Sequence, residues 1–267
     1  MRNDFKWRKV YARYVNLSHR KDRLLHMQNE IKKLGIPVER YEAIRTVDSG
    51  WNREPYKTMF NRTRGAIGCA LSQMEAMEGG LKLNMDIMIL EDDVKVCQDF
   101  PQRMDYIEGY LNTHEWDIMW LGATVSVNPP YWHTGRNPDL VVENPLGRDA
   151  ECTDDPRILR TYGEFCTYAY VINKNSIEKV LSLLNSIMHE SMGIDWSMIK
   201  LQPQLKTFCF VPGSVFQIDN QSDIGQGITA FTPFLKLNGT LENSAYVYQD
   251  KMEDFDPTTF DFAEAKI

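Results

Sequence analysis

Short apolar runs alternate with longer amphipathic segments at the start of the chain. Residues 10–17, VYARYVNL, are rich in Val and Tyr and predict a first strand. Residues 19–35 have apolar positions at helical spacing, with Ser18 as the expected N-cap and Gly35 as the expected C-cap. Residues 38–44, VERYEAI, predict a second strand. Strand, helix and strand in this order predict the opening of a doubly wound α/β sheet.

The next segment again places a helix before a strand. Small residues recur from about residue 66 to residue 77 in a helical pattern, and Gly79 and Gly80 are expected to end this helix. Small residues on one helix face allow the close approach of a neighbouring backbone or of a ligand, and both alternatives remain open. The run Ile87–Leu90 is short, apolar and bounded by polar residues, which is typical of a strand buried on both faces.

The second half continues the alternation with less regular segments between its elements. It predicts helices over residues 101–113 and 174–188, strands over 116–124 and 163–173, and one or two strands within 205–220. Long loops are expected over 45–63 and 125–160, because neither segment shows periodicity. We therefore expect one α/β domain over residues 1–240 and an acidic, aromatic tail over 241–267.

Composition narrows the class of protein. The 267 residues are 43% hydrophobic and 25% charged, and the net charge of −7 gives no overall attraction to nucleic acid or anionic membranes. No stretch approaches the roughly 20 apolar residues of a membrane-spanning helix, and the charged start lacks the apolar segment of a signal peptide. The five cysteines show no metal-binding spacing. These features predict a cytoplasmic protein with free thiols.

Three carboxylates follow the apolar run of the third strand. Glu91, Asp92 and Asp93 would repel one another, and carboxylate oxygens are suitable ligands for Mg²⁺ or Mn²⁺. Open α/β sheets also bind their ligands at strand ends. The alternative is an acidic loop at a strand exit.

Cations gather in the turn after the first strand. His19, Arg20, Lys21 and Arg23 lie at the start of the first helix, where free backbone N–H groups favour phosphate. The alternative is a solvated basic helix start.

Several stretches together resemble one family. YVNLSHRKDR, RGAIGCALSQ, MILEDDV, TYAYVINKNS, GIDW and VPGSVFQ occur in the order seen in glycosyltransferase family 25, from about Tyr14 to Ile224. That family includes bacterial lipooligosaccharide galactosyltransferases and collagen hydroxylysine galactosyltransferases. The resemblance implies a GT-A fold, an α/β/α sandwich around a mainly parallel mixed sheet. It also implies inverting transfer of galactose or glucose from a UDP-sugar, with Mn²⁺ or Mg²⁺, to a hydroxyl of a glycan or a hydroxylated side chain.

The resemblance also assigns roles to individual residues. Glu91 and Asp93 would bind the metal, and Asp92 would contact the ribose. The other nucleotide-sugar contacts would come from the turn after the first strand, from the RGAIGCALS segment and from a late strand: Asn16, Leu17, Arg20, Arg23, Arg64, Ser72 and Gln217. Gln73 departs from the family pattern, which commonly has His at this position.

Inverting transfer needs a base for the acceptor hydroxyl. Asp195 in GIDW is the candidate, and the alternative is that it caps its helix. Trp196 would stack on a sugar or belong to the core.

Two other functions compete with a transferase. A phosphohydrolase or nucleotidyltransferase would use the same carboxylates, but no His/Asp cluster and no phosphate loop with Lys-Ser/Thr accompanies them. An inactive nucleotide-sugar or carbohydrate-binding module would keep the fold, which Gln73 favours slightly and the intact acidic residues disfavour. The expected source is bacterial or viral.

Overall fold

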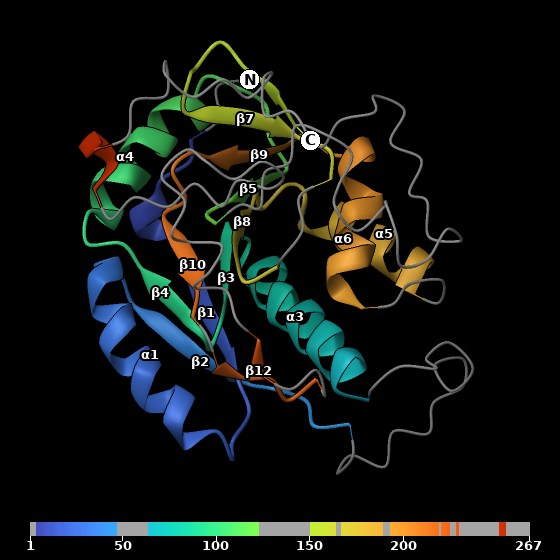
Figure 1. Cartoon of the computed structure of the whole chain (residues 1–267). Helices are drawn as coiled ribbons and strands as arrows, with labels where there is room; N and C mark the ends of the chain where they lie inside the picture. The colour runs from blue at the N-terminus through green and yellow to red at the C-terminus, as the bar shows by residue number, and fades with distance from the viewer. Residues whose placement is uncertain are drawn as a thin grey trace, which may run out of the picture.

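The fold is an α/β/α sandwich (Figure 1). The computed structural model describes residues 4–46, 64–122, 150–163, 167–188, 193–218, 220–224, 228–229 and 251–254. The main sheet contains β1 (Tyr11–Asn16), β2 (Val38–Glu42), β3 (Ile87–Glu91), β5 (Ile118–Trp120), β6 (Ala150–Cys152), β7 (Ile158–Thr161), β8 (Ala169–Ile172) and β9 (Thr207–Phe210). Two small ribbons pair β4 (Val94–Val96) with β10 (Val215–Gln217) and β11 (Asn220–Gln221) with β12 (Ile228–Thr229).

The strand order of the main sheet is β2-β1-β3-β8-β5-β9-β7-β6. β1 is parallel to β2 and β3, and β5 is parallel to β9. β8 is antiparallel to its neighbours β3 and β5, and β7 is antiparallel to its neighbours β9 and β6. Only β7 and β8 of these described strands therefore run against the others, which confirms the predicted mixed, mainly parallel α/β sheet.

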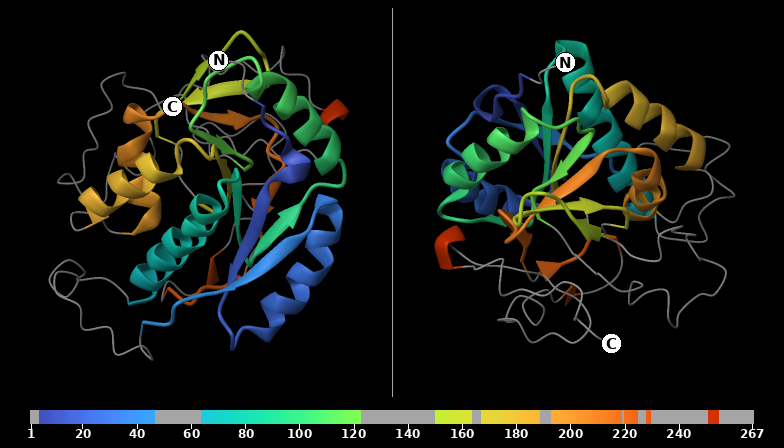
Figure 2. Two further views of the ribbon diagram at one scale, coloured as in Figure 1. Left: turned by 180° about the vertical axis from the view of Figure 1, so that it is seen from behind. Right: turned by 90° about the horizontal axis from the view of Figure 1, so that it is seen from above.

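Helices cover both faces of this sheet (Figure 2). They are α1 (Lys21–Leu34) and α4 (Phe100–Leu111) on one face and α3 (Arg64–Leu83), α5 (Ile177–Ile187) and α6 (Ile194–Leu201) on the other. In β3, Ile87 and Ile89 pack toward α3 and α5, whereas Met88 and Leu90 pack toward α1 and α4. All four side chains are fully buried, which confirms a strand covered on both faces.

The predicted end of the helix expected over residues 66–77 is wrong. α3 continues through Gly79 and Gly80 to Leu83. A Cβ atom at Gly80 would lie 2.7 Å from the Cβ atom of Ile87, and one at Gly79 would lie 2.8 Å from the ring of Tyr11. These glycines therefore let the helix approach the sheet closely, and the packing contact outweighs their low helix propensity.

Other differences from the predicted elements are local. α1 begins at Lys21 with Arg20 as its N-cap, so Ser18 is not the cap, whereas Gly35 is the C-cap with a φ of +69° as expected. β6 and β7 lie at the end of the segment predicted as a loop over 125–160. Residues 125–149 of that loop and most of the loop over 45–63 lie outside the described residues. In the predicted tail, Met252 packs against the core below α1 and α4. Among the described helices, none has the length and apolar character to cross a membrane.

Candidate functional site

One edge of the sheet brings together three strand ends from distant parts of the sequence. β1 and β3 are parallel, with Val15 opposite Glu91, so both carboxyl ends lie at this edge. β8 runs the other way, and the carbonyl of Tyr168 just before it accepts a hydrogen bond from the Glu91 N–H at 2.8 Å. The start of β8 therefore lies beside the acidic triplet, at an edge where α/β sheets commonly bind ligands.

The acidic triplet forms the centre of this edge. Glu91 ends β3, and Asp92 and Asp93 form the turn into β4. Gln217 reaches them from β10, because β10 pairs with β4. Its Nε2 donates to Glu91 Oε2 at 3.0 Å and to Asp93 Oδ1 at 3.2 Å. The two carboxylates predicted as metal ligands thus converge on one amide group.

Several carboxyl groups lie close together around Glu91. Burial raises the pKa of Glu91 well above its usual value, and the neighbouring Asp93, Asp195 and Asp92 raise it further. Burial also raises the pKa of Asp92, against the opposing effect of Arg23. The Arg23 guanidinium lies 2.5 Å from Asp92 Oδ1 and 3.3 Å from Asp93 Oδ2.

The donor set fits a divalent cation whose remaining ligands come from elsewhere. Among the described residues no group of three or more His, Cys, Asp or Glu side chains is arranged to hold a metal. Two converging carboxylates are nevertheless the protein contribution that Mg²⁺ commonly uses, with phosphate oxygens and water completing the coordination. A cation between Glu91 and Asp93 would also relieve the repulsion that raises the Glu91 pKa.

Polar side chains from β1, β2 and β11 also bind the acidic triplet or orient the residues that do. Asn16 donates from Nδ2 to Asp92 Oδ2 at 2.7 Å, and Arg40 donates from Nε to Asn16 Oδ1 at 2.8 Å. Arg40 thereby fixes the orientation of the Asn16 amide. Asn220 donates to Asp93 Oδ2 at 3.0 Å.

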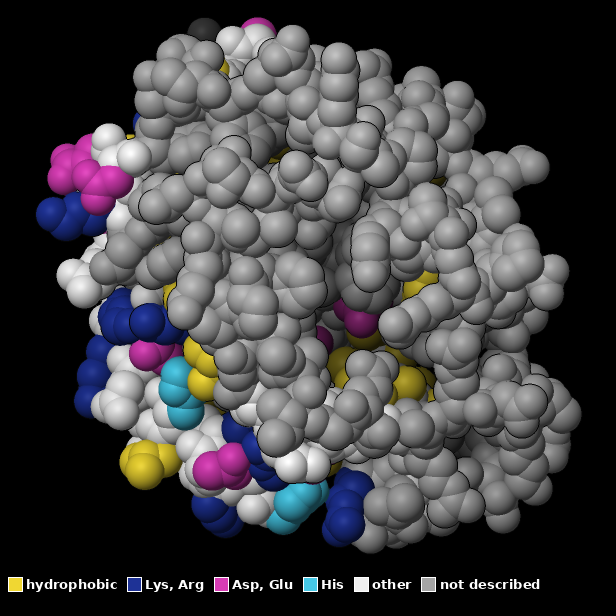
Figure 3. Space-filling view, in the orientation of Figure 1, with side chains coloured by type: hydrophobic (Ala, Val, Ile, Leu, Met, Phe, Trp, Pro, Cys, Tyr) yellow, Lys and Arg dark blue, Asp and Glu magenta, His cyan; other side chains and the backbone are white. Residues whose placement is uncertain are grey.

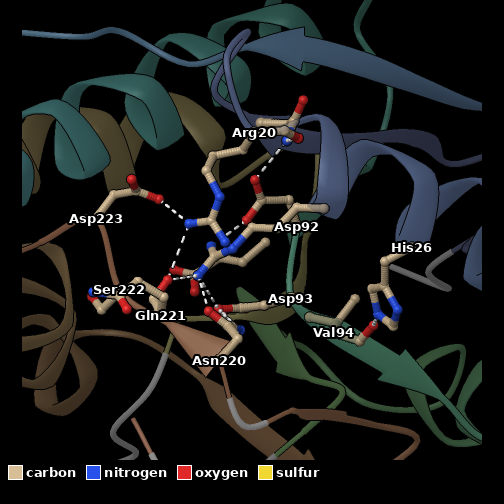
Figure 4. A network of polar contacts seen from close by, with 12 residues as sticks. Arg20, His26, Asp92, Asp93, Val94, Asn220, Gln221, Ser222 and Asp223 are labelled. Carbon is tan, nitrogen blue, oxygen red and sulfur yellow. Dashed lines mark hydrogen bonds and ion pairs between the residues drawn. The ribbon is translucent and has the colours of Figure 1, made fainter. Parts of the chain in front are cut away.

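Arg20 is occupied by other partners (Figure 4). It forms ion pairs with Asp22, at 2.8 Å, and with Asp223, and it donates to the carbonyl of Gln221 at 3.0 Å. The backbone carbonyl of Leu17 accepts the Arg20 N–H at 3.0 Å. Arg20 and Leu17 therefore form no hydrogen bond with the acidic triplet.

The surface around the site carries charges of both signs. On the face shown in Figure 3, basic side chains gather over α1 and acidic side chains appear in a recess.

Asp195 contacts the start of β8 instead of capping α6. The N-cap of α6 is Gly193, and Asp195 lies inside the first turn of the helix. Asp195 Oδ1 accepts hydrogen bonds from the Thr167 N–H and the Thr167 hydroxyl, both at 2.8 Å. The helix-cap alternative is therefore wrong. Burial raises the pKa of Asp195, while its bonds to Thr167 oppose that shift.

Two of the residues predicted to contact the nucleotide-sugar, Ser72 and Arg64, are not found at the acidic triplet among the described side chains. Ser72 is fully buried, donates to the Gly68 carbonyl and accepts from the Ile44 N–H at 2.8 Å, so it holds the chain before the first long loop and does not reach the triplet. A Cβ at Gly68 would lie 2.5 Å from the Ile44 carbonyl oxygen, which assigns the small-residue face here to backbone packing. The side chain of Arg64 lies outside the described residues.

Four residues of the site were not predicted. Arg40, Thr167 and Asn220 each contact a predicted site residue. Tyr170 contacts Gln73, which the sequence analysis noted only as a departure from the family pattern. Arg40 and Tyr170 lie in β2 and β8 and Asn220 in β11, whereas Thr167 precedes β8. Their pattern along the sequence is that of ordinary strand residues, and their contacts arise only when the sheet brings distant segments together.

One family profile matches most of the chain, whereas the solved structures that it resembles are only distantly similar. The sequence profile of a family described as Glycosyltransferase family 25 (LPS biosynthesis protein) matches residues 12–198. Among curated proteins, none matches the sequence significantly. Among solved structures, the chain is similar to UDP-glucose pyrophosphorylase from Acinetobacter baumanii, with 13% identity and a TM-score of 0.36 over 74% of this chain and 61% of that chain. It is also similar to mouse xyloside xylosyltransferase 1 in the apo form, with 13% identity and a TM-score of 0.38 over 75% of this chain and 71% of that chain. The chain thus spans less than two thirds of the length of the pyrophosphorylase.

Proposed function

Because the chain belongs to glycosyltransferase family 25, a family of sugar-transferring enzymes, we propose that it transfers a hexose from a UDP-sugar with inversion. The hexose is galactose or glucose, and the acceptor is a hydroxyl of a glycan or of a hydroxylated side chain. The observation that carries the proposal is the convergence of Glu91 and Asp93 on one point at the carboxyl edge of the sheet, beside the Arg23 guanidinium.

The donor half of the site consists of this point and the first turn. Glu91 and Asp93 would hold Mn²⁺ or Mg²⁺, which when bound neutralises the negative charge that develops on the diphosphate. Arg23 supplies a fixed positive charge beside them, and a pre-placed guanidinium stabilises a phosphate leaving group. Asn16, held by Arg40, and Asp92 form the polar wall that would face the nucleoside.

The acceptor half is centred on Asp195. Inversion requires a base that removes the proton of the attacking hydroxyl on the side opposite to the leaving UDP. Two Thr167 donors hold Asp195 Oδ1, which leaves Oδ2 for the acceptor hydroxyl. The raised pKa of Asp195 strengthens its carboxylate as a base, because a more basic carboxylate accepts the proton more readily.

Calorimetric titration of UDP tests the donor half. We expect UDP to bind in the presence of Mn²⁺, to bind much more weakly with EDTA, and to lose its Mn²⁺-dependent binding in Asp93→Ala. Absence of UDP binding by the wild type in the presence of Mn²⁺ would refute the proposal. An inactive binding module would bind UDP in the same way, but turnover of any UDP-sugar excludes it.

A further inference from the structure

A buried glutamine joins the two halves of the site. Gln73 lies on α3 and is fully buried. Its Nε2 donates to Glu91 Oε1 at 2.9 Å and to the Thr167 hydroxyl at 3.2 Å. Its Oε1 accepts the Tyr170 hydroxyl proton at 2.7 Å. All three partners come from the strand ends at the site, and one of them holds Asp195.

The hydrogen bonds that join Tyr170, Gln73, Glu91 and Thr167 have defined donors and acceptors. The Tyr170 hydroxyl donates to the amide oxygen of Gln73, so the NH₂ group of Gln73 points to Glu91 Oε1, which accepts. The Thr167 hydroxyl has one proton, which it donates to Asp195, so toward Gln73 it accepts. The chain of donors therefore runs from Tyr170 through Gln73 and Thr167 to Asp195, with a branch from Gln73 to Glu91.

Glutamine matches these three partners better than histidine would. The amide has two N–H donors on one atom and an acceptor on the other, which are the groups that Glu91, Thr167 and Tyr170 require. A neutral imidazole has a single N–H donor, and an imidazolium has no acceptor for the Tyr170 hydroxyl. Glutamine also carries no charge, so its own NH₂ group and amide oxygen keep their donor and acceptor roles at any pH.

We propose that Gln73 is a positioning residue that couples the donor carboxylate Glu91 to the base Asp195 through Thr167. This inference rests on the proposed transferase function. It assigns to Gln73 two simultaneous effects, because the same NH₂ group orients Glu91 on the donor side and Thr167 on the acceptor side. A residue with only a packing role would change stability without affecting both halves of the site.

The test is a double-mutant cycle with two readouts. Gln73→Met keeps the length of the side chain and removes its hydrogen bonds to Glu91, Thr167 and Tyr170. Thr167→Val removes the hydroxyl that accepts from Gln73 and donates to Asp195. UDP affinity with Mn²⁺ is measured by calorimetry, and kcat is measured as UDP release from UDP-galactose and UDP-glucose. Gln102→Met, the same change at an exposed position on α4, is the matched control and should stay within about twofold of the wild type.

We expect Gln73→Met to weaken UDP binding and to lower kcat by about 10-fold or more, as for the loss of groups that orient reacting residues. Thr167→Val should lower kcat and leave UDP affinity unchanged. The double variant should be no slower than Gln73→Met by more than about twofold, because the two residues act through one connection. Additive losses in kcat, or unchanged UDP affinity in Gln73→Met, would overturn the proposal.

Tyr170→Phe provides a second, milder variant in case Gln73→Met does not fold. It removes the hydroxyl that fixes the amide and keeps the ring, which packs against Trp120. It should show both effects of Gln73→Met at smaller size, and wild-type values for both would contradict the coupling. If the wild type and Gln102→Met release no UDP from either donor, the transferase function itself fails. If both are active and Gln73→Met equals them, only the positioning role fails.

Discussion

Replacing Glu91 with Gln should stabilise the metal-free protein while removing its function. Glu91 Oε2 and Asp93 Oδ1 accept from the same Gln217 amide at 3.0 and 3.2 Å, so these oxygens are at most about 6 Å apart. Two unit charges about 6 Å apart repel by about 3 kcal/mol at an effective dielectric constant of about 20. The NH₂ group introduced by the substitution faces the amide donor of either Gln73 or Gln217, and the loss of that hydrogen bond offsets about 1 kcal/mol of this gain. The net expectation is a free energy of unfolding about 2 kcal/mol higher in Glu91→Gln at pH 8.

The pH dependence follows from the sign of the pKa shift. Folding raises the pKa of Glu91 above its value in the unfolded chain, so the folded state loses stability as the pH rises through the folded-state pKa. Glu91→Gln has no such loss, and the titrating groups that do not interact with Glu91 cancel in the difference. The difference in the free energy of unfolding between Glu91→Gln and the wild type should therefore be small near the unfolded-state pKa of Glu91. It should increase toward pH 8.

Urea unfolding at pH 5 and pH 8 in the presence of EDTA measures this difference in the free energy of unfolding. Glu178→Gln, at an exposed position on α5, is the control and should change the free energy of unfolding by less than about 0.5 kcal/mol at either pH. Adding Mn²⁺ and UDP should stabilise the wild type and not Glu91→Gln, because a ligand stabilises only the state that binds it. The reasoning is refuted if Glu91→Gln is no more stable than the wild type at pH 8, or if the difference does not depend on pH.

Three further predictions concern separate parts of the molecule. Asp195→Asn should keep Mn²⁺-dependent UDP affinity in calorimetry and lower kcat by about 100-fold or more, as for loss of a general base, and unchanged turnover would exclude Asp195 from that role. Arg23→Met should weaken UDP binding more than Arg20→Met does, because Arg23 faces the acidic triplet and Arg20 is held by Asp22 and Asp223; equal losses would contradict this difference. In urea unfolding, Gly109→Ala in α4 should stabilise the protein by about 0.5–1 kcal/mol, since open space surrounds the new methyl group, whereas Gly80→Ala should destabilise it by about 1–3 kcal/mol through overpacking against β3.

Hydrophobic patterning predicted the elements whose burial is continuous. Ile87–Leu90 could be assigned to a strand covered on both faces because an apolar run between polar residues has few other uses. The end of α3 could not be predicted, because glycine normally favours a helix end and only the contact with β3 explains why Gly80 continues the helix. β6 and β7 were missed because AEC and ILRT are short and carry no clear alternation.

The site shows the same division between local and tertiary information. The carboxylates of the triplet could be proposed as a group because they are adjacent in the sequence and follow a buried strand. Arg40 and Thr167 could not, because each becomes part of the site only through a partner far along the chain, Asn16 for the first and Asp195 for the second. Gln217 was predicted from family resemblance, and its contact with the triplet depends on the pairing of β4 with β10.

The most direct test of the proposed function is UDP release from a panel of UDP-sugars by the purified protein in the presence of Mn²⁺. UDP-galactose or UDP-glucose should be turned over by the wild type, and turnover should disappear with EDTA and in Asp93→Ala. A wild-type protein that binds UDP but releases none from any UDP-sugar would contradict the account and leave a binding module in its place.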